Sequence, residues 1–206
     1  MPIDPRTRDV RRSFTDVLDV LTPDQWEAPS LAAGWTVRHV AAHMLLPINT
    51  SMPRFAIGML AAGGKFDRMA DRAARRDARV PTAQLVAAHR ASIDAGWRAP
   101  GDEVAPITHH VVHGLDIVRP LGIDWPLPDD VMVAVLDSLT GERSLSHFDV
   151  DLSGVELHAT DVDWQHGSGV VVSGPAADLV LALSRRPAGL AGEGVARLAD
   201  RTPRSR

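Results

Sequence analysis

Two histidines, His109 and His113, lie four residues apart in the segment VAPITHHVVHGLDIVRPLG. On an α-helix, side chains at this spacing project from the same side, so both imidazoles can reach one point. Two neutral imidazoles that converge in this way form half of a binding site for a divalent transition metal. His110 lies three residues before His113, and spacing alone does not decide between it and His109 as the partner of His113.

A third histidine, His43, lies on another apolar segment, GWTVRHVAAHMLL. His39 falls nearly opposite the apolar stripe of that segment, which predicts a solvated surface residue, whereas His43 lies nearer the edge of the stripe. If the two segments pack side by side, His43, His109 and His113 can hold a metal and leave coordination positions open. Open positions are typical of catalytic metal sites, since structural zinc sites usually have four protein ligands.

A metal site requires a particular orientation of the helix that carries the histidine pair. Both histidines fall off its apolar stripe, which consists of Ile107, Val111, Leu115 and Val118. Their side of the helix must therefore face a cleft or another element instead of bulk water. The remaining histidines are predicted to form local hydrogen bonds (His158 and His166) or to lie on the surface (His89 and His147).

The composition of the 206 residues indicates a folded protein, because 45% of them are hydrophobic. The formal net charge of −4 provides no overall basic field for nucleic acid. The basic stretch at residues 68–79 includes Asp71 and Asp77 and has no aromatic residues for stacking on bases, so it is predicted to be solvated. We therefore expect no nucleic-acid partner.

Cysteine is absent from the sequence. Metal ligation must therefore use histidines and carboxylates, and any thiol chemistry must use a thiol from outside the protein. The N-terminal segment MPIDPRTRDVRR lacks the apolar region of a secretory signal, and no apolar run reaches the length of a membrane span. These features predict a cytoplasmic protein without a membrane partner.

Helical periodicity and helix-breaking residues predict a largely helical N-terminal part. Helices are expected at residues 4–22, 36–46, 54–62, 82–97 and 128–143, and over the HHVVH segment up to Pro120. Thr36 and Thr82 are predicted N-caps. Residues 65–79 are predicted to form a solvated helix or loop.

The character of the sequence changes after about residue 145. VELHAT alternates apolar and polar residues and VVVSG is β-branched, so both are predicted strands, joined by the loop DVDWQHGSG. Helices are expected at residues 176–184 and 194–200. The predicted fold class is α+β, with a helical bundle at residues 1–143 and a small α/β domain at residues 144–206.

Three blocks of the sequence together resemble the DinB-like, mycothiol-dependent maleylpyruvate isomerase family of actinobacteria. The blocks are GWTVRHVAAHML, HHVVHGLDIVRPLG and VELHATDVDWQHGSGVVVSGPAADLVLALSRRPAGL, and the resemblance extends from Leu21 to about Leu198. It implies a DinB-like four-helix bundle followed by a small C-terminal α/β domain. The bundle would bind a divalent metal through one histidine on its second helix and a pair on its fourth.

The resemblance also implies roles for particular residues. The metal ligands would be His43, His109 and His113, which favours His109 over His110. Members of the family often have an acidic residue where this sequence has His39, so His39 departs from the pattern.

Two arginines match family positions as well. Arg186 follows Arg185, which stands where glycine is common in the family. It matches a family arginine expected to be catalytic, by binding the carboxylate of a substrate or thiol. Arg186 can equally complement the dipole at a helix C-terminus. Arg119 fits the family motif and is expected to contribute to binding mycothiol, although an intrahelical ion pair with Asp116 explains its spacing equally well.

The function implied by the resemblance is activation of an external thiol, mycothiol, by a bound metal. The thiolate would attack an electrophilic small molecule, either to transfer sulfur or to permit isomerisation. Zinc is the expected metal, and nickel or iron also suit histidine ligands. The alternatives are a metal-dependent hydrolase and a non-catalytic stress protein that binds a metal or small ligand. A monomer or a homodimer is expected.

Overall fold

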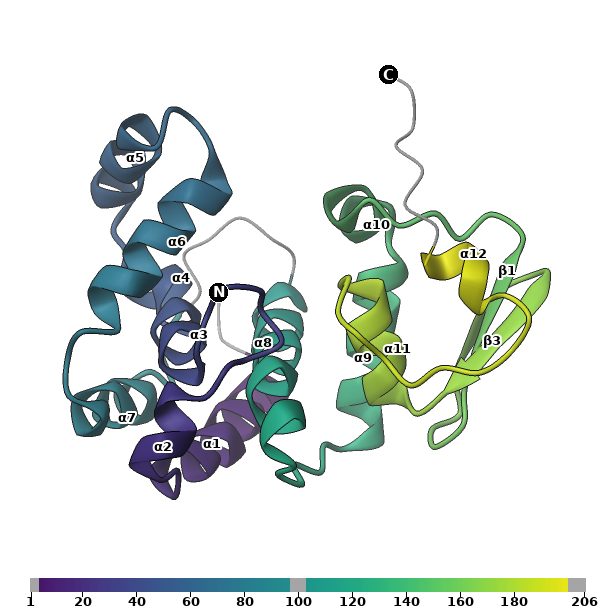
Figure 1. Ribbon diagram of the computed structural model, residues 1–206, viewed down its shortest axis with the longest axis horizontal. Coiled ribbons are helices and arrows are strands. Elements are labelled where there is room, and N and C mark those ends of the chain that lie inside the picture. The colour runs from purple at the N-terminus through teal and green to yellow at the C-terminus, as the bar shows by residue number, and fades with distance from the viewer. Residues whose placement is uncertain (1–3, 97–102, 200–206) are drawn as a thin grey trace. The chain divides into compact units, whose positions relative to one another are not determined.

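The computed structural model describes residues 4–96 and 103–199, which fall into two compact units divided after Pro126. Four of the helices described in the first unit form a bundle, and the others lie around it (Figure 1). The first unit contains α1 (Pro5–Asp19), α2 (Pro23–Glu27), α3 (Val37–Met44), α4 (Leu46–Asn49), α5 (Met52–Ala61), α6 (Phe66–Asp77), α7 (Thr82–Ala91) and α8 (Ala105–Leu121). No helix among the described residues is both long and apolar enough to cross a bilayer.

Helices α1, α3, α7 and α8 form the bundle, because α1 and α3 each pack against both α7 and α8. All four were predicted, at residues 4–22, 36–46 and 82–97 and over the HHVVH segment. Helix α7 ends at Ala91, earlier than predicted, and the predicted end at residue 97 lies outside the described residues. Phe14, Val40 and Ile107 have no exposed surface and represent the apolar core between the helices. The predicted four-helix bundle is confirmed.

The chain on either side of α3 and α8 determines where these two helices begin and end. Thr36 is the N-cap of α3 as predicted, and its backbone N–H donates to Nδ1 of His39 at 3.2 Å. Helix α8 ends at Gly122, which adopts the left-handed conformation with φ of 64°. Glycine is favoured there because it has no Cβ to clash with the backbone.

A glycine in the middle of α8 accommodates a tryptophan side chain. Trp125 is buried against Gly114, and its indole N–H donates to the Ser13 hydroxyl at 3.1 Å. A Cβ atom at position 114 would overlap the six-membered ring of Trp125.

We expect Gly114→Ala to lower the free energy of unfolding by about 1–3 kcal/mol, because overpacking outweighs the higher helix propensity of alanine. Urea unfolding measures this difference. Trp125→Leu in the Gly114→Ala background should recover part of the loss if the clash is its cause. Equal stability of Gly114→Ala and wild type would show that Trp125 does not pack on this glycine.

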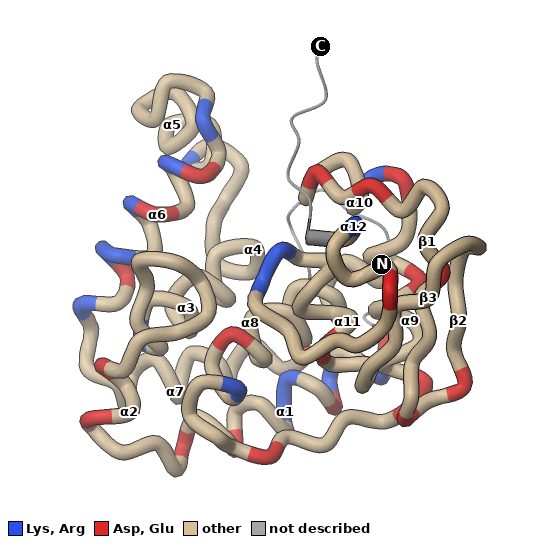
Figure 2. Tube along the Cα trace, turned by 45° about the vertical axis from the view of Figure 1, so that its right-hand side comes forward, with Lys and Arg blue, Asp and Glu red and all other residues tan. Residues whose placement is uncertain are grey.

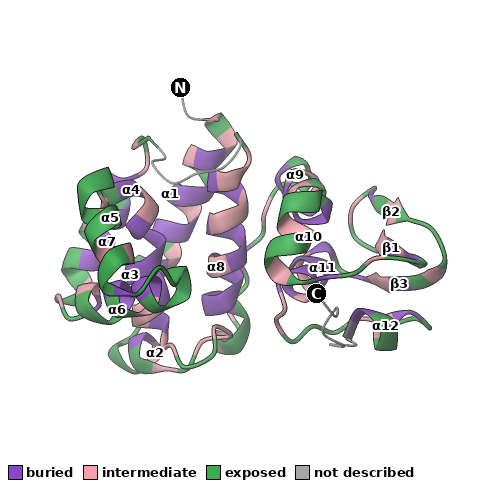
Figure 3. Cartoon of the chain, turned by 90° about the horizontal axis from the view of Figure 1, so that it is seen from above, coloured by how far each residue is buried: buried purple, intermediate pink, exposed green. Residues whose placement is uncertain are grey.

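Helix α6 corrects the prediction of a solvated segment at residues 65–79. Charged residues of both signs follow the helix (Figure 2), yet one narrow face is buried. This face packs against α3 and consists of Met69, Ala70, Ala73 and Ala74. Three of the four are alanines, so the apolar signal in the sequence is weak. Helix α5, in contrast, has no buried residue (Figure 3).

Two buried polar side chains on α1 and α7 were not predicted. Arg11 is 2% exposed, and its Nη1 donates to the carbonyls of Ser92 and Ala95 just beyond α7, at 2.8 and 2.7 Å. His89 is also 2% exposed and its Nε2–H donates to the Ala41 carbonyl at 2.9 Å, so its predicted surface position is wrong. Both contacts join residues far apart in the sequence, which helical periodicity does not reveal.

The second unit combines helices with a three-stranded sheet. It contains α9 (Asp129–Thr140), α10 (Glu142–Phe148), β1 (Val155–Ala159), β2 (Gln165–Gly167), β3 (Val170–Gly174), α11 (Ala176–Leu183) and α12 (Val195–Ala199). The strand order is β2-β1-β3. Strand β1 pairs with β3 in parallel, with Val155 opposite Val170, and with β2 antiparallel, with Leu157 opposite His166.

The α+β fold class and the strands VELHAT and VVVSG are confirmed. Strand β2 lies in the predicted loop, because three residues are too few to show an alternating pattern. The predicted domain boundary lies after residue 143, whereas the compact units divide after Pro126. Helix α9 belongs to the second unit because it packs on α11.

Candidate metal centre

Three histidines from two helices of the bundle form one cluster. His43 lies on α3, and His109 and His113 lie on α8, which packs against α3 (Figure 1). One nitrogen from each ring lies within 4.8 Å of the other two. The ring centroids are 5.4 Å apart for His43 and His109, 4.8 Å for His43 and His113, and 4.7 Å for His109 and His113. The side of α8 that carries the pair thus faces another helix, as the metal-site hypothesis requires.

The structure shows that His109, and not its neighbour His110, lies with His43 and His113, which spacing alone did not decide. His110 is 1% exposed, and its Nδ1–H donates to the carbonyl of Pro106 at 2.8 Å. It does not belong to the group of rings around His43. His39, the other histidine of α3, is half-buried and also lies outside the group. Its Nδ1 accepts from the backbone N–H of Thr36 instead.

The surroundings of His109 favour its neutral form. Both ring nitrogens are buried, although the residue as a whole is partly exposed. Burial lowers the pKa of His109 well below the ordinary value, and the nearby His113 and His43 lower it further. A histidine must be deprotonated to bind a metal, so this environment keeps the ring ready for ligation at neutral pH.

The cluster fits a divalent cation by its donor set and its dimensions. Metal–nitrogen bonds of about 2.0–2.1 Å place the ligand nitrogens of a tetrahedral site about 3.3 Å apart. Side-chain adjustments of about 1 Å would bring nitrogens that now lie within 4.8 Å to this separation. Three neutral imidazoles suit zinc, nickel, iron or copper better than calcium or magnesium, which prefer oxygen ligands.

A buried carboxylate contacts one of the three rings. Asp116 is fully buried, and its Oδ2 accepts from Nδ1–H of His113 at 2.9 Å. The sequence predicted Asp116 only as a partner of Arg119, and this contact was not predicted. The three-residue spacing between His113 and Asp116 in HGLD was the signal that could have revealed it, because such residues are neighbours on a helix.

A tryptophan forms one wall of the cluster and was also missed. The rings of Trp35 and His43 lie 5.0 Å apart. The indole N–H of Trp35 donates to Oδ1 of Asp71 on α6 at 2.9 Å, and Arg75 binds the same oxygen at 2.8 Å. Helix α6 therefore orients the aromatic ring that shields His43 from water.

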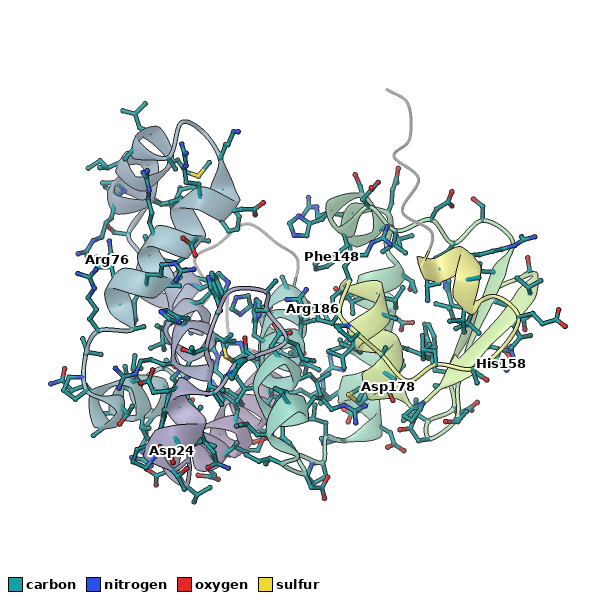
Figure 4. All side chains as sticks on the ribbon, in the orientation of Figure 1. Asp24, Arg76, Phe148, His158, Asp178 and Arg186 are labelled. Atoms are coloured by element: carbon teal, nitrogen blue, oxygen red, sulfur yellow. The ribbon has the colours of Figure 1, made fainter. Side chains whose placement is uncertain are left out.

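The two predicted arginines lie in different units. Arg119 is exposed on α8, six residues after His113 and thus about 9 Å further along the helix axis. Arg186 lies just beyond α11 in the second unit (Figure 4), and its Nη1 donates to the carbonyl of Ser184.

The end of α11 requires the left-handed backbone conformation at Arg185. Arg185 has φ of 64°, and its N–H donates to the carbonyl of Ala182, while the N–H of Arg186 donates to that of Leu181. This pattern is the Schellman motif, whose left-handed residue is usually glycine. The side chain of Arg185 donates to the Phe148 carbonyl at 3.0 Å, a contact that glycine would lack.

A four-helix bundle whose second and fourth helices bring three histidines together defines the class of DinB-like bundle proteins. The sequence profile described as the mycothiol maleylpyruvate isomerase N-terminal domain matches residues 7–115, which is more than half of the chain. The chain belongs to the mycothiol maleylpyruvate isomerase family. Membership of this family identifies the protein as an enzyme of the isomerase and transferase type.

Solved structures share the fold. The crystal structure of the mycothiol-dependent maleylpyruvate isomerase is 15% identical in sequence, with a TM-score of 0.57. The crystal structure of a mutant of the same enzyme, with a histidine replaced by alanine, is 16% identical in sequence, with a TM-score of 0.58. Each comparison covers 91% of this chain and 90% of the other. Among curated proteins, none matches this sequence significantly.

Proposed function

We propose that this protein binds a divalent metal through His43, His109 and His113 and uses mycothiol to isomerise, or to transfer sulfur to, an electrophilic small molecule. The observation that carries the proposal is the convergence of three ring nitrogens within 4.8 Å, on a chain that belongs to this family. Zinc is the proposed metal and maleylpyruvate the first electrophile to assay. The bundle of the first unit, which ends at Pro126, would hold the metal.

A bound divalent cation would favour the thiolate form of an incoming thiol, whose pKa is otherwise near 8.5. The neutral rings of His43, His109 and His113 would hold the cation without cancelling its charge. Trp35, packed 5.0 Å from His43, would limit access of water to that side of the cluster. The protein has no cysteine, so the sulfur nucleophile must come from the external thiol.

The proposal includes Arg186 and Arg119 as groups that bind the carboxylates of thiol or substrate. An arginine can form two parallel hydrogen bonds with a carboxylate, which orients it as well as binding it. These roles rest on the resemblance of the segments around both residues to the family. Arg186 is also partly accessible to solvent.

Thermal unfolding of the zinc-loaded protein tests this function. Mycothiol at about 100 times its Kd should stabilise the protein by about 2.7 kcal/mol, which raises the Tm by about 5 °C or more for a chain of this size. An analogue with a hydroxyl in place of the thiol should stabilise it much less. Arg186→Met should weaken the stabilisation by mycothiol without changing the zinc content. Isomerisation of maleylpyruvate by the loaded protein is then assayed with and without mycothiol.

Two outcomes of this experiment would contradict the proposal. Zinc binding without any stabilisation by mycothiol would favour a hydrolase or a non-catalytic metal-binding protein. Equal stabilisation by mycothiol in zinc-free protein, or in His43→Ala, would show that the thiol binds without the metal.

A further inference from the structure

A hydrogen bond of Asp116 determines which nitrogen of His113 can face a ligand. The carboxylate oxygen Oδ2 lies 2.9 Å from Nδ1 of His113, and a carboxylate can only accept, so Nδ1 carries the proton. Nε2 of His113 is then the nitrogen with a free lone pair. The Asp116 side chain has no exposed surface, so no water competes for it from bulk solvent.

The main chain of Asp116 makes a second contact that the sequence explains. In a regular α-helix, the carbonyl of residue 116 would accept from the N–H of residue 120. Residue 120 is Pro120, which lies inside α8 and has no N–H. The carbonyl of Asp116 instead accepts from the N–H of Leu31, at 3.0 Å.

The contact with Leu31 attaches a loop to α8 beside the cluster. This loop, residues 28–36, connects α2 to α3 and carries Trp35, whose ring packs against His43. A second tie, from the Ser30 N–H to the carbonyl of Trp35 at 3.0 Å, closes the loop on itself. One residue thus contacts a cluster histidine by its side chain and the Trp35 loop by its carbonyl.

We propose that Asp116 is the positioning residue of the histidine cluster. Its carboxylate holds His113 with Nε2 toward His43 and His109, and its carbonyl, released by Pro120, holds the loop that presents Trp35 to His43. The proposal rests on the proposed function for its relation to a metal. The tautomer that it assigns to His113 holds with or without a metal.

The carboxylate of Asp116 is also expected to strengthen metal binding, because of the general chemistry of histidine ligands. A carboxylate that accepts from the distal N–H of a metal-bound imidazole orients the ring and makes it more basic. Loss of such a partner typically lowers metal affinity by about 10–100-fold. An amide in place of the carboxylate retains an acceptor but loses the charge, so Asp116→Asn and Asp116→Ala separate orientation from basicity.

The first experiment measures the tautomer of His113 in metal-free protein by ¹⁵N–¹H NMR of the imidazole rings. At a pH well above the ordinary histidine value of about 6.5, His113 of the wild type should carry its proton on Nδ1. Asp116→Asn should keep this tautomer, and Asp116→Ala should move the population toward the Nε2–H form. A wild-type His113 protonated on Nε2, or no change in Asp116→Ala, would overturn the proposal.

The second experiment measures zinc affinity by competition with a chromophoric chelator. We expect losses of about 10-fold or more in Asp116→Asn and larger losses in Asp116→Ala. Thr15→Val is the matched control, since the Thr15 hydroxyl is also buried and donates within the bundle, to the carbonyl of Arg11 at 2.7 Å. Affinity that falls equally in Thr15→Val and Asp116→Ala would reduce Asp116 to a general structural role and overturn the proposal.

Pro120→Ala tests the role of the main chain. It restores an N–H that can compete for the Asp116 carbonyl, so hydrogen exchange at Leu31 should become faster and the fluorescence of the tryptophans should change. Unchanged exchange at Leu31 would contradict the role assigned to the carbonyl. If wild-type protein binds no zinc, the proposed function fails, while the tautomer of His113 and the exchange at Leu31 still test the positioning role.

Discussion

Replacing His109 with alanine should remove stoichiometric zinc from the purified protein. Two ligands remain in His109→Ala. Removing a group that only hydrogen-bonds to a ligand typically lowers metal affinity by about 10–100-fold, and we expect the loss of a ligand itself to lower zinc affinity far more. His43→Ala and His113→Ala should behave in the same way, because each contributes one of the three nitrogens within 4.8 Å. Elemental analysis together with chelator competition measures the effect.

Two neighbouring histidines supply matched controls for these substitutions. His110→Ala truncates a buried ring next to His109, and His39→Ala truncates a ring one turn before His43 on α3. Both should retain zinc, although His110→Ala will lower the stability of the fold. Loss of zinc in His110→Ala with retention in His109→Ala would mean that the wrong member of the adjacent pair has been assigned.

The metal-free protein should lose stability steeply as the pH falls below about 6.5. Burial lowers the pKa of His89 to about 4 and that of His110 to about 3, and the pKa of His109 is lowered as well. A group whose folded pKa is lowered stabilises the fold above its unfolded pKa, and this contribution is lost as the pH falls toward the folded pKa. At pH about 5, His89 and His110 should each lower the free energy of unfolding by about 2 kcal/mol relative to neutral pH.

The combined loss of about 4 kcal/mol is comparable to the total stability of many domains. Urea unfolding of zinc-free protein at a series of pH values measures it. His89→Gln retains a donor for the Ala41 carbonyl but does not titrate, so its stability should fall by about 2 kcal/mol less over the same pH range. A wild-type stability that stays constant down to pH about 5 would show that these rings are not held neutral.

The elements that the sequence predicted correctly are those whose signal is local. The four bundle helices have apolar stripes at helical spacing, and Thr36 marks the start of α3. The convergence of His109 and His113 follows from their spacing on one helix. Their meeting with His43 required the packing of two helices, which only the family resemblance implied.

The features that sequence analysis missed depend on contacts between distant segments. Trp35 approaches His43 because Asp71, far along the chain on α6, accepts from its indole N–H. The buried face of α6 was overlooked since alanines among charged residues give a weak apolar pattern. Arg11 is hidden because its partners are carbonyl groups, which every residue has, so no side-chain pattern indicates such a contact.

The proposed function depends on one cation held by three imidazoles from two helices, and anomalous diffraction from crystals of the zinc-loaded protein tests this most directly. We expect a single strong peak at the zinc edge, within about 2.0–2.1 Å of one nitrogen each of His43, His109 and His113. A peak bound by other residues, or none between these rings in fully loaded protein, would contradict it.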